Sequence, residues 1–214
     1  MPIKNIIFDF GNVLIDLDIP KTVQELSKFL GTEVPETLRN HLDETVFNTF
    51  EVGGITEDDF VTALQQVAKT PASKTAIIEA WNAMLLQIPS YRFTFLTELK
   101  KDYRLFLLSN TNETHLRWVD QYLQRTYQSS IENFNRHFEK AYYSHLIQLR
   151  KPGVEIYQYV LQDAGIQVNE TVFIDDNYQN ILGAKAVGLH TIHLGVEEEV
   201  IETLPKFLAQ YQID

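Results

Sequence analysis

Short apolar runs that alternate with helical patterns are the feature that most constrains how this chain can fold. The runs are rich in β-branched and aromatic residues, and all but the third are tightly bounded by turn-forming residues. They span residues 3–8, 103–108, 141–144, 171–174 and 190–194. Helical patterns lie between the later runs, at residues 155–164 and at residues 177–187, where Gly188 marks the end. This alternation predicts an α/β fold, a doubly wound parallel sheet with helices on both faces.

A long segment without a convincing strand separates the first apolar run from the second. Its helical patterns cover residues 20–30, 35–45, 56–68 and 73–86, and a further helix at 91–100 leads into the second run. Thr56 and Asp59 have the spacing of a capping box at the start of the third pattern. A connection of this length most often serves as a lid or a binding surface. We therefore expect residues 18–89 to form an inserted all-helical cap, and residues 1–17 with 90–214 to form the α/β core.

Composition and charge exclude several classes of function. The 214 residues contain no cysteine, which excludes a disulfide framework, a thiolate metal site and a cysteine nucleophile. The formal net charge of −11 argues against broad nucleic-acid binding, which needs a basic surface. No uncharged apolar run reaches the roughly 20 residues that span a bilayer. We expect a cytoplasmic protein that binds neither membranes nor nucleic acid.

Polar side chains follow four of the apolar runs, at the point where each run ends. In chain order they are Asp9, Ser109, Asn110, Lys151, Asp175 and Asp176. The carboxyl ends of parallel strands meet at one edge of a sheet, so we expect these side chains to lie close together. Carboxylates, a hydroxyl with nearby backbone amides and a lysine suit phosphoryl transfer, in which the protein mainly positions the reactants and neutralises charge.

The chemistry of each group suggests its role. Asp9 is our candidate nucleophile. Asp9 and Asp176 would bind Mg²⁺, which prefers oxygen ligands, and the repulsion between neighbouring carboxylates favours a bound cation. Ser109, with the amides at Asn110 and the following helix start, suits phosphate oxygens, and Lys151 would add positive charge there. Each residue taken singly also fits an ordinary turn, helix cap or exposed lysine, so the prediction depends on the whole set.

The chain resembles the haloacid dehalogenase-like hydrolases over essentially its whole length, in the subfamily with a helical cap inserted after the first motif. The motifs that carry the resemblance are IIFDFGNVL, LLSNTN, RKP and FIDDN, in that order. More narrowly, FDFGNVL and SNTNETH resemble the branch that contains bacterial glucose-1-phosphate phosphatases and the phosphatase-like domain of epoxide hydrolases. The resemblance implies a Rossmann-like core, an aspartyl-phosphate intermediate on Asp9, and phosphate bound by Ser109 and Lys151.

The resemblance also implies a magnesium site, and there the sequence departs from the family's pattern. Magnesium would be bound by Asp9, the backbone carbonyl of Gly11 and Asp176, with Asp175 supporting the site. Most phosphatases of the family carry a second aspartate where this chain has Gly11, and that aspartate acts as acid and base. Losing such a group typically costs about 10²–10⁴-fold in rate. His115, in the first turn of the helix after the Ser109 loop, is a candidate substitute, although its position is also typical of a solvent-facing histidine.

Two acidic residues near the first motif and a glycine pair in the predicted cap are further candidates. Asp16 and Asp18 fit a hinge into the cap better than a site for proton transfer. Glu51, Gly53 and Gly54 resemble the family's substrate-facing loop, where glycines permit close backbone approach and Glu51 suits a sugar hydroxyl or a cationic group. A plain turn before a capped helix explains these three residues equally well.

The function that the sequence favours is a Mg²⁺-dependent phosphatase for a small phosphate ester, a sugar phosphate first of all, working as a monomer or homodimer. A metal-independent 2-haloacid dehalogenase is one alternative, since such enzymes also lack the second aspartate, but the pair Asp175 and Asp176 argues against it. A catalytically weak protein that binds phosphate or a partner is the other alternative, because of Gly11.

Overall fold

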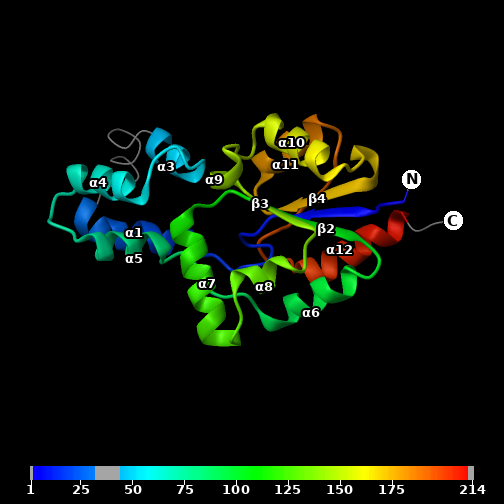
Figure 1. Ribbon diagram of the computed structural model, residues 1–214, viewed down its shortest axis with the longest axis horizontal. Helices are drawn as coiled ribbons and strands as arrows, with labels where there is room; N and C mark the ends of the chain where they lie inside the picture. The colour runs from blue at the N-terminus through cyan, green and yellow to red at the C-terminus, as the bar shows by residue number, and fades with distance from the viewer. Residues whose placement is uncertain (1, 32–43, 212–214) are drawn as a thin grey trace.

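A parallel β-sheet forms the centre of the structure, a computed structural model that describes residues 2–31 and 44–211 (Figure 1). Its strands are β1 (Asn5–Phe8), β2 (Arg104–Ser109), β3 (Lys140–Tyr143), β4 (Thr171–Asp175) and β5 (His190–His193). They pair in the order β3-β2-β1-β4-β5, and every pair is parallel. The chain builds outward from β1 to one side and then to the other, so β1 lies at the switch point where such sheets bind ligands.

Helices cover both faces of the sheet (Figure 1). On one face lie α10 (Val154–Ala164) and α11 (Tyr178–Ala186). On the other lie α6 (Ser90–Leu99), α7 (Glu113–Tyr127), α8 (Ile131–Asn135) and α12 (Val200–Leu208). The short elements α9 (Ser144–Ile147), η1 (Val168–Glu170) and η2 (Ala209–Tyr211) complete this part. We call the sheet with these elements the α/β core.

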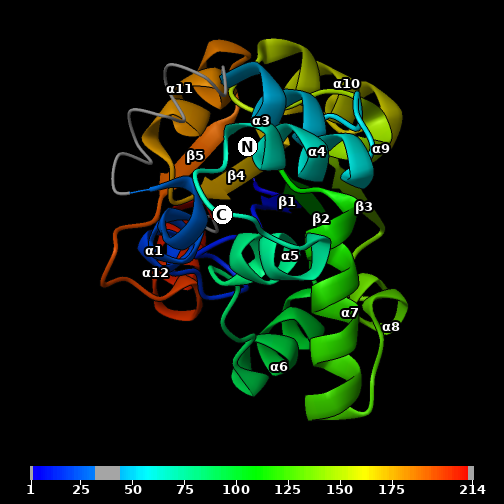
Figure 2. The ribbon, with the colours of Figure 1, turned by 90° about the vertical axis from the view of Figure 1, so that its left-hand side faces the viewer.

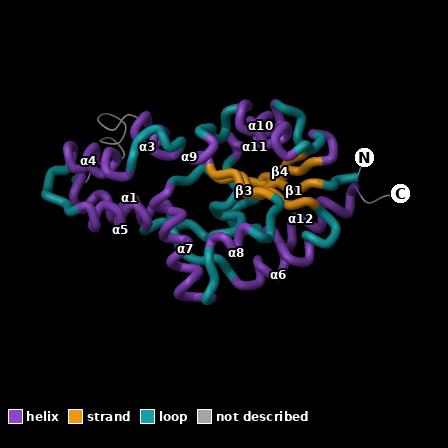
Figure 3. The backbone as a smooth tube through the Cα atoms, in the orientation of Figure 1, coloured by secondary structure: helices purple, strands orange, loops and turns teal. Residues whose placement is uncertain are grey.

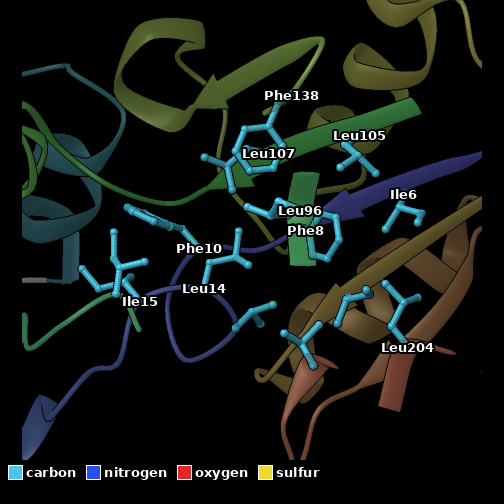
Figure 4. Close-up of a cluster of buried hydrophobic side chains, with 14 of the residues drawn as sticks. Ile6, Phe8, Phe10, Leu14, Ile15, Leu96, Leu105, Leu107, Phe138 and Leu204 are labelled. Atoms are coloured by element: carbon cyan, nitrogen blue, oxygen red, sulfur yellow. The ribbon is translucent and has the colours of Figure 1, made fainter. Parts of the chain in front are cut away.

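The alternation of side chains along each strand explains the two layers of helices. In β1, Ile6 and Phe8 point to one face, and Ile7 points to the other. Figure 4 shows Ile6 and Phe8 in the cluster that Leu96 of α6 and Leu204 of α12 cover. Because both faces are covered, β1 is buried along its length and apolar from Ile6 to Phe8, as buried parallel strands are.

Among the described residues, four further helices form a separate lobe beside the carboxyl ends of the strands (Figures 1 and 3). They are α1 (Ile19–Leu30), α3 (Glu44–Glu51), α4 (Glu57–Val67) and α5 (Lys74–Asn82). The lobe has its own apolar cluster, in which the rings of Phe50 and Phe60 stack with centroids 4.4 Å apart and Trp81 packs against Phe60. We call these helices the helical lobe. Figure 2 shows them in front of the sheet.

Two chain segments connect the helical lobe to the α/β core, and they run side by side. The amide of Asp16 donates to the carbonyl of Gln87 at 2.8 Å, and the amide of Leu86 donates to the carbonyl of Asp16 at 3.0 Å. A further bond joins the amide of Asp18 to the carbonyl of Met84 at 2.8 Å. The chain therefore enters and leaves the helical lobe through one antiparallel connection.

The five predicted strands and most of the predicted helices are present, with bounds shifted by a few residues. The capping box of Thr56 and Asp59 is confirmed. The predicted helix at 73–86 ends at Asn82, because the chain beyond it pairs with residues 16–18. The predicted helix at 35–45 lies mostly outside the described residues. Helix α12 was not predicted, and among the described residues no helix has the length and apolar character needed to cross a membrane.

Candidate active site

Asp9, Lys151 and Asp175 form a buried charged cluster at the carboxyl edge of the sheet. The Nζ atom of Lys151 lies 2.6 Å from Oδ1 of Asp9 and 2.7 Å from Oδ2 of Asp175. Strands β1 and β4 are neighbours with Phe8 opposite Ile174, so the residues that follow bring the two carboxylates together. The structure thus unites three of the residues that the sequence singled out.

Asparagines hold the acidic residues in place. The side-chain amide of Asn180 donates to both carboxylate oxygens of Asp175, at 3.1 and 3.0 Å, and the amide of Asn177 donates to Oδ1 at 2.7 Å. The side chain of Asn12 donates to Oδ2 of Asp176 at 2.8 Å. Sequence reasoning missed Asn12 and Asn180 as functional residues. Their signal was faint, since one is part of an ordinary turn and the other is a polar residue inside a helix.

The electrostatics of the cluster suit a cation. Burial raises the pKa of Asp9 to about 7, and the charge of Asp175 adds to the rise, while Lys151 opposes it. Burial likewise raises the pKa of Asp176. Burial lowers the pKa of Lys151, but the two carboxylates outweigh this and keep it above its usual value. Ligand oxygens of Asp9, Asp175 and Asp176 lie within 4.8 Å of one another, with a single lysine against three acids, so the donor set fits a divalent cation such as Mg²⁺.

Ser109 and Asn110 lie next to this cluster but have different surroundings. The hydroxyl of Ser109 has only a long contact, 3.5 Å, to the carbonyl of Asn110. The side chain of Asn110 is engaged at both ends, because its amide donates to the carbonyl of Lys151 and its oxygen accepts from the amide of Lys151, each at 2.9 Å. Asn110 therefore positions Lys151 through its side chain.

Leu17 occupies the space beside Gly11. A Cβ atom on Gly11 would lie 2.7 Å from Cδ1 of Leu17. The side chain of Leu17 thus lies where a larger residue at position 11 would project.

His115 is buried, and the solvent-facing position that the sequence suggested is wrong. Its ring stacks on Trp81 with centroids 5.0 Å apart, and its Nδ1 lies 2.8 Å from Oδ1 of Asn82. Burial lowers the pKa of His115 to about 3. The ring is therefore neutral near pH 7, which opposes the role of general acid that we considered for it.

Several polar contacts hold the helical lobe against the α/β core. The guanidinium of Arg150 donates to the carboxylate of Glu51 at 3.0 and 3.2 Å. At the start of α4, Glu57 accepts from the hydroxyl of Thr114 at 2.8 Å and forms an ion pair with Arg117. Asp16 pairs with Arg92 at 2.7 Å, which agrees with a structural role near the connection of the two parts.

A cavity of about 720 Å³ lies between the helical lobe and the α/β core. Gly11, Ser109 and His115 line it from the core, and Glu51 lines it from the lobe. Gly53 and Gly54, which we expected beside Glu51 at the substrate, instead line a second cavity of about 330 Å³. The reason is close packing: a Cβ atom on Gly53 would lie 2.4 Å from the carbonyl oxygen of His145.

Comparison with known proteins gives consistent matches. The family model of haloacid dehalogenase-like hydrolases matches residues 3–188. The D-ribitol-5-phosphate phosphatase of Bacteroides thetaiotaomicron is 29% identical over 189 residues, which cover 88% of this chain and 90% of that protein. A sesquiterpene phosphatase of Aspergillus oryzae is 27% identical over 192 residues, which cover 89% of each protein.

Solved structures agree with these matches. A HAD family enzyme from Bacteroides thetaiotaomicron has a TM-score of 0.86 and 32% identity, covering 95% of this chain and 99% of its own. A variant of that enzyme in complex with magnesium and inorganic phosphate has a TM-score of 0.84. A 2-haloacid dehalogenase from Pseudomonas syringae shares the fold at a TM-score of 0.63, with 17% identity.

Proposed function

Since this chain belongs to the haloacid dehalogenase-like hydrolases, we propose that it is a Mg²⁺-dependent phosphatase that hydrolyses small phosphate monoesters through an intermediate on Asp9. The observation that carries this proposal is the cluster of Asp9, Lys151 and Asp175 with Asp176 beside it. Relatives over most of the chain are phosphatases by name, which supports the same activity. We also propose that the helical lobe, residues 18–89, is the cap over the site that residues 1–17 and 90–214 build.

The acidic residues of the cluster would hold the metal ion. We assign Asp9, Asp176 and the backbone carbonyl of Gly11 as ligands, with Asp175 supporting the site through its bonds to Asn180. The bound ion supplies positive charge that offsets the charge of the phosphate and of the carboxylates. The complex of the related enzyme with magnesium and inorganic phosphate supports magnesium as the bound ion.

The protein's own groups account for the steps of the reaction. A carboxylate oxygen of Asp9 attacks phosphorus, the bond from phosphorus to the leaving oxygen breaks, and the alcohol leaves after taking a proton. Water then attacks the phosphorus of the aspartyl-phosphate and loses a proton, the bond from phosphorus to the Asp9 oxygen breaks, and inorganic phosphate leaves the free carboxylate of Asp9. Lys151 holds the attacking carboxylate at 2.6 Å, and Ser109 with the backbone amide at Asn110 would bind phosphate oxygens.

The source of the proton for the leaving alcohol sets this protein apart from the family's common pattern. Gly11 has no carboxyl group, Leu17 fills the space beside it, and His115 is neutral. We propose that water in the cavity between core and cap provides the proton. Esters with acidic alcohols then react fastest, because they need the least help in leaving.

Two substrate classes have support from relatives. The D-ribitol-5-phosphate phosphatase supports a sugar or polyol phosphate, the class that the sequence favours, and the sesquiterpene phosphatase supports the phosphate of a hydrophobic alcohol. The polar or apolar character of the cavity lining distinguishes between these two substrate classes.

The test of the proposed function is a direct assay of phosphate release. A panel of sugar, polyol, aryl and alkyl phosphates is incubated with the protein in Mg²⁺ and again in EDTA. We expect release in Mg²⁺ and none in EDTA. No release from any ester would leave phosphate binding without turnover as the better account, and release of halide from a 2-haloacid in EDTA would favour a dehalogenase.

A further inference from the structure

The cavity beside Asp9 is mainly apolar at the end where the leaving group would lie. Phe10, Ile15 and Leu17 line it from the α/β core, where Figure 4 shows Phe10 and Ile15 beyond the end of β1. Val23 and Leu26 of α1 line it from the helical lobe, together with Phe47 of α3. A group attached to the phosphate would meet hydrocarbon from both sides.

Several polar side chains of the lining are engaged within the protein, whereas the indole Nε1 of Trp81 is buried without a hydrogen-bond partner among the described residues. The hydroxyl of Thr22 donates to the carbonyl of Trp81 at 3.1 Å and accepts from the amide of Met84 at 2.9 Å. Glu51 and Arg150 are paired with each other. These groups have few bonds left for a ligand.

The same holds for two polar residues on the core side of the cavity. Both ends of the Asn110 side chain form hydrogen bonds to the backbone of Lys151. His115 bonds to Asn82 through Nδ1 and stacks on Trp81. The hydroxyl groups of a polyol would lose bonds to water here and gain few in return, whereas a hydrocarbon would gain by leaving water.

The size of the cavity and the spread of its lining suit a group of several carbon atoms. Its volume of about 720 Å³ is within the roughly 300–1,000 Å³ typical of sites for larger organic ligands. Ser109 and Gly11 lie at the phosphate end, and Ile19, which is 53% exposed, lies where the cavity lining reaches the surface. The lining extends from Gly11 and Ser109, which lie close to Asp9 in the chain and the sheet, to Ile19 and Val23 of α1.

We propose that the substrate is an amphiphilic phosphate monoester, whose alcohol carries a hydrocarbon chain that fills this cavity, rather than a polyol phosphate. This inference rests on the proposed phosphatase function, because it places the phosphate at Asp9. It makes the walls of the cavity, and Val23 and Ile19 in particular, determinants of specificity.

The test uses n-alkyl phosphates from ethyl to octyl, whose alcohols differ little in acidity, so that only the chain varies. We expect kcat/KM in Mg²⁺ to rise with chain length by up to about 4-fold per methylene, and to exceed the value for glycerol 3-phosphate. A flat series, or faster hydrolysis of the polyol ester, would overturn the inference and leave the phosphatase function standing. Hydrolysis of no ester would reject the phosphatase function itself.

Binding provides a readout that does not depend on turnover. Calorimetry with Mg²⁺ compares octylphosphonate with ethylphosphonate, neither of which can be hydrolysed to an alcohol. We expect the longer chain to bind at least tenfold more tightly. Equal affinities would show that the cavity does not take the chain and would overturn the inference.

Variants in the wall locate the effect. Val23→Gln places a polar group in the cavity, and Ile19→Gln does so at an exposed position where folding is not at risk. Val196→Gln is the matched control, because Val196 is fully exposed and is not part of the lining. We expect both cavity variants to lower the ratio of octyl to ethyl activity several-fold, and the control to keep it. An unchanged ratio in both would count against the inference.

Discussion

Leu17 fills the space into which a side chain at Gly11 would project, since a Cβ atom on Gly11 would come within 2.7 Å of its Cδ1 atom. The two residues therefore pack as a pair, with the small residue in the nucleophile's loop against the end of a flexible apolar side chain. A larger residue at position 11 requires Leu17 to move.

The first prediction restores an acid at this place. Gly11→Asp alone crowds Leu17, so we expect little gain, whereas Gly11→Asp with Leu17→Ala makes room for a carboxyl group. The double variant should hydrolyse alkyl phosphates up to about 10²-fold faster than Leu17→Ala alone, because general acid catalysis contributes on this order. Nitrophenyl phosphate, whose alcohol is acidic, should gain much less. Equal rates for the double variant and Leu17→Ala would show that position 11 cannot supply the proton.

The second prediction concerns the nucleophile. Asp9→Asn removes the attacking carboxylate and should lower phosphate release to background. The fold should persist, because the amide can still accept from Lys151. Asp102→Asn, at an exposed position of the α/β core, is the control and should keep the parent rate. Turnover by Asp9→Asn at the parent rate would disprove a covalent intermediate on Asp9.

The third prediction concerns the metal. Mg²⁺ should raise the melting temperature, since a ligand at about 100 times its Kd stabilises the folded state by about 2.7 kcal/mol. Asp176→Asn should remove most of that shift, because it takes away one of the clustered carboxylates. Calorimetry with and without EDTA measures both effects. A shift that survives in Asp176→Asn would place the ion elsewhere.

The fourth prediction is a pH dependence at the contact of α4 with the α/β core. Burial alone would raise the pKa of Glu57, but hydrogen bonds from Lys74, Thr114 and Arg117 outweigh it and lower the pKa to about 2. The contribution of Glu57 to stability is therefore fully present above its ordinary value of 4.5 and is lost as pH falls towards 2. The difference in melting temperature between the parent and Glu57→Gln should shrink over this range. Glu202→Gln, at an exposed site of α12, is the control. If the difference in melting temperature between the parent and Glu57→Gln stays constant down to pH 2, the charge of Glu57 does not contribute to stability and the contact acts through packing.

The fifth prediction separates two roles for His115. Burial lowers its pKa to about 3 from 6.5, so folding favours the neutral ring, and this contributes a loss of stability as pH falls from 6.5 towards 3. His115→Gln should lose less stability than the parent over that interval. The acid limb of the pH–rate profile should stay where it is in this variant. A shifted limb would return His115 to the role of proton donor.

The edge of the sheet where Asp9 and Asp175 meet could be predicted from the sequence, because short apolar runs and parallel pairing fix where each strand delivers its next residue. The partners that orient these groups could not. Asn180 lies only five positions after Asp175, but a polar residue inside a helix gives no distinct signal, and Asn110 reaches Lys151 across 41 positions of the chain. The second contact depends on how elements pack, so no local pattern encodes it.

The surroundings of His115 were unpredictable for the same reason. Local sequence places it in the first turn of a helix, where histidines usually face solvent. Its burial comes from Trp81 and Asn82 at the end of α5, which the connection at residues 84–87 brings over α7. Gly53 shows the converse: its turn was visible in the sequence, but the surface against which it packs, at His145, was not.

The paired segments at Asp16 and Gln87 have a consequence for how such a protein can change over time. The amide of Asp16 donates to the carbonyl of Gln87 at 2.8 Å, so the chain enters and leaves the helical lobe at one place. A change of length within the lobe leaves these paired segments, and with them the path of the chain into the sheet, in place. The residues that carry the chemistry at Asp9 and those that line the lobe side of the cavity therefore lie in separate parts of the chain.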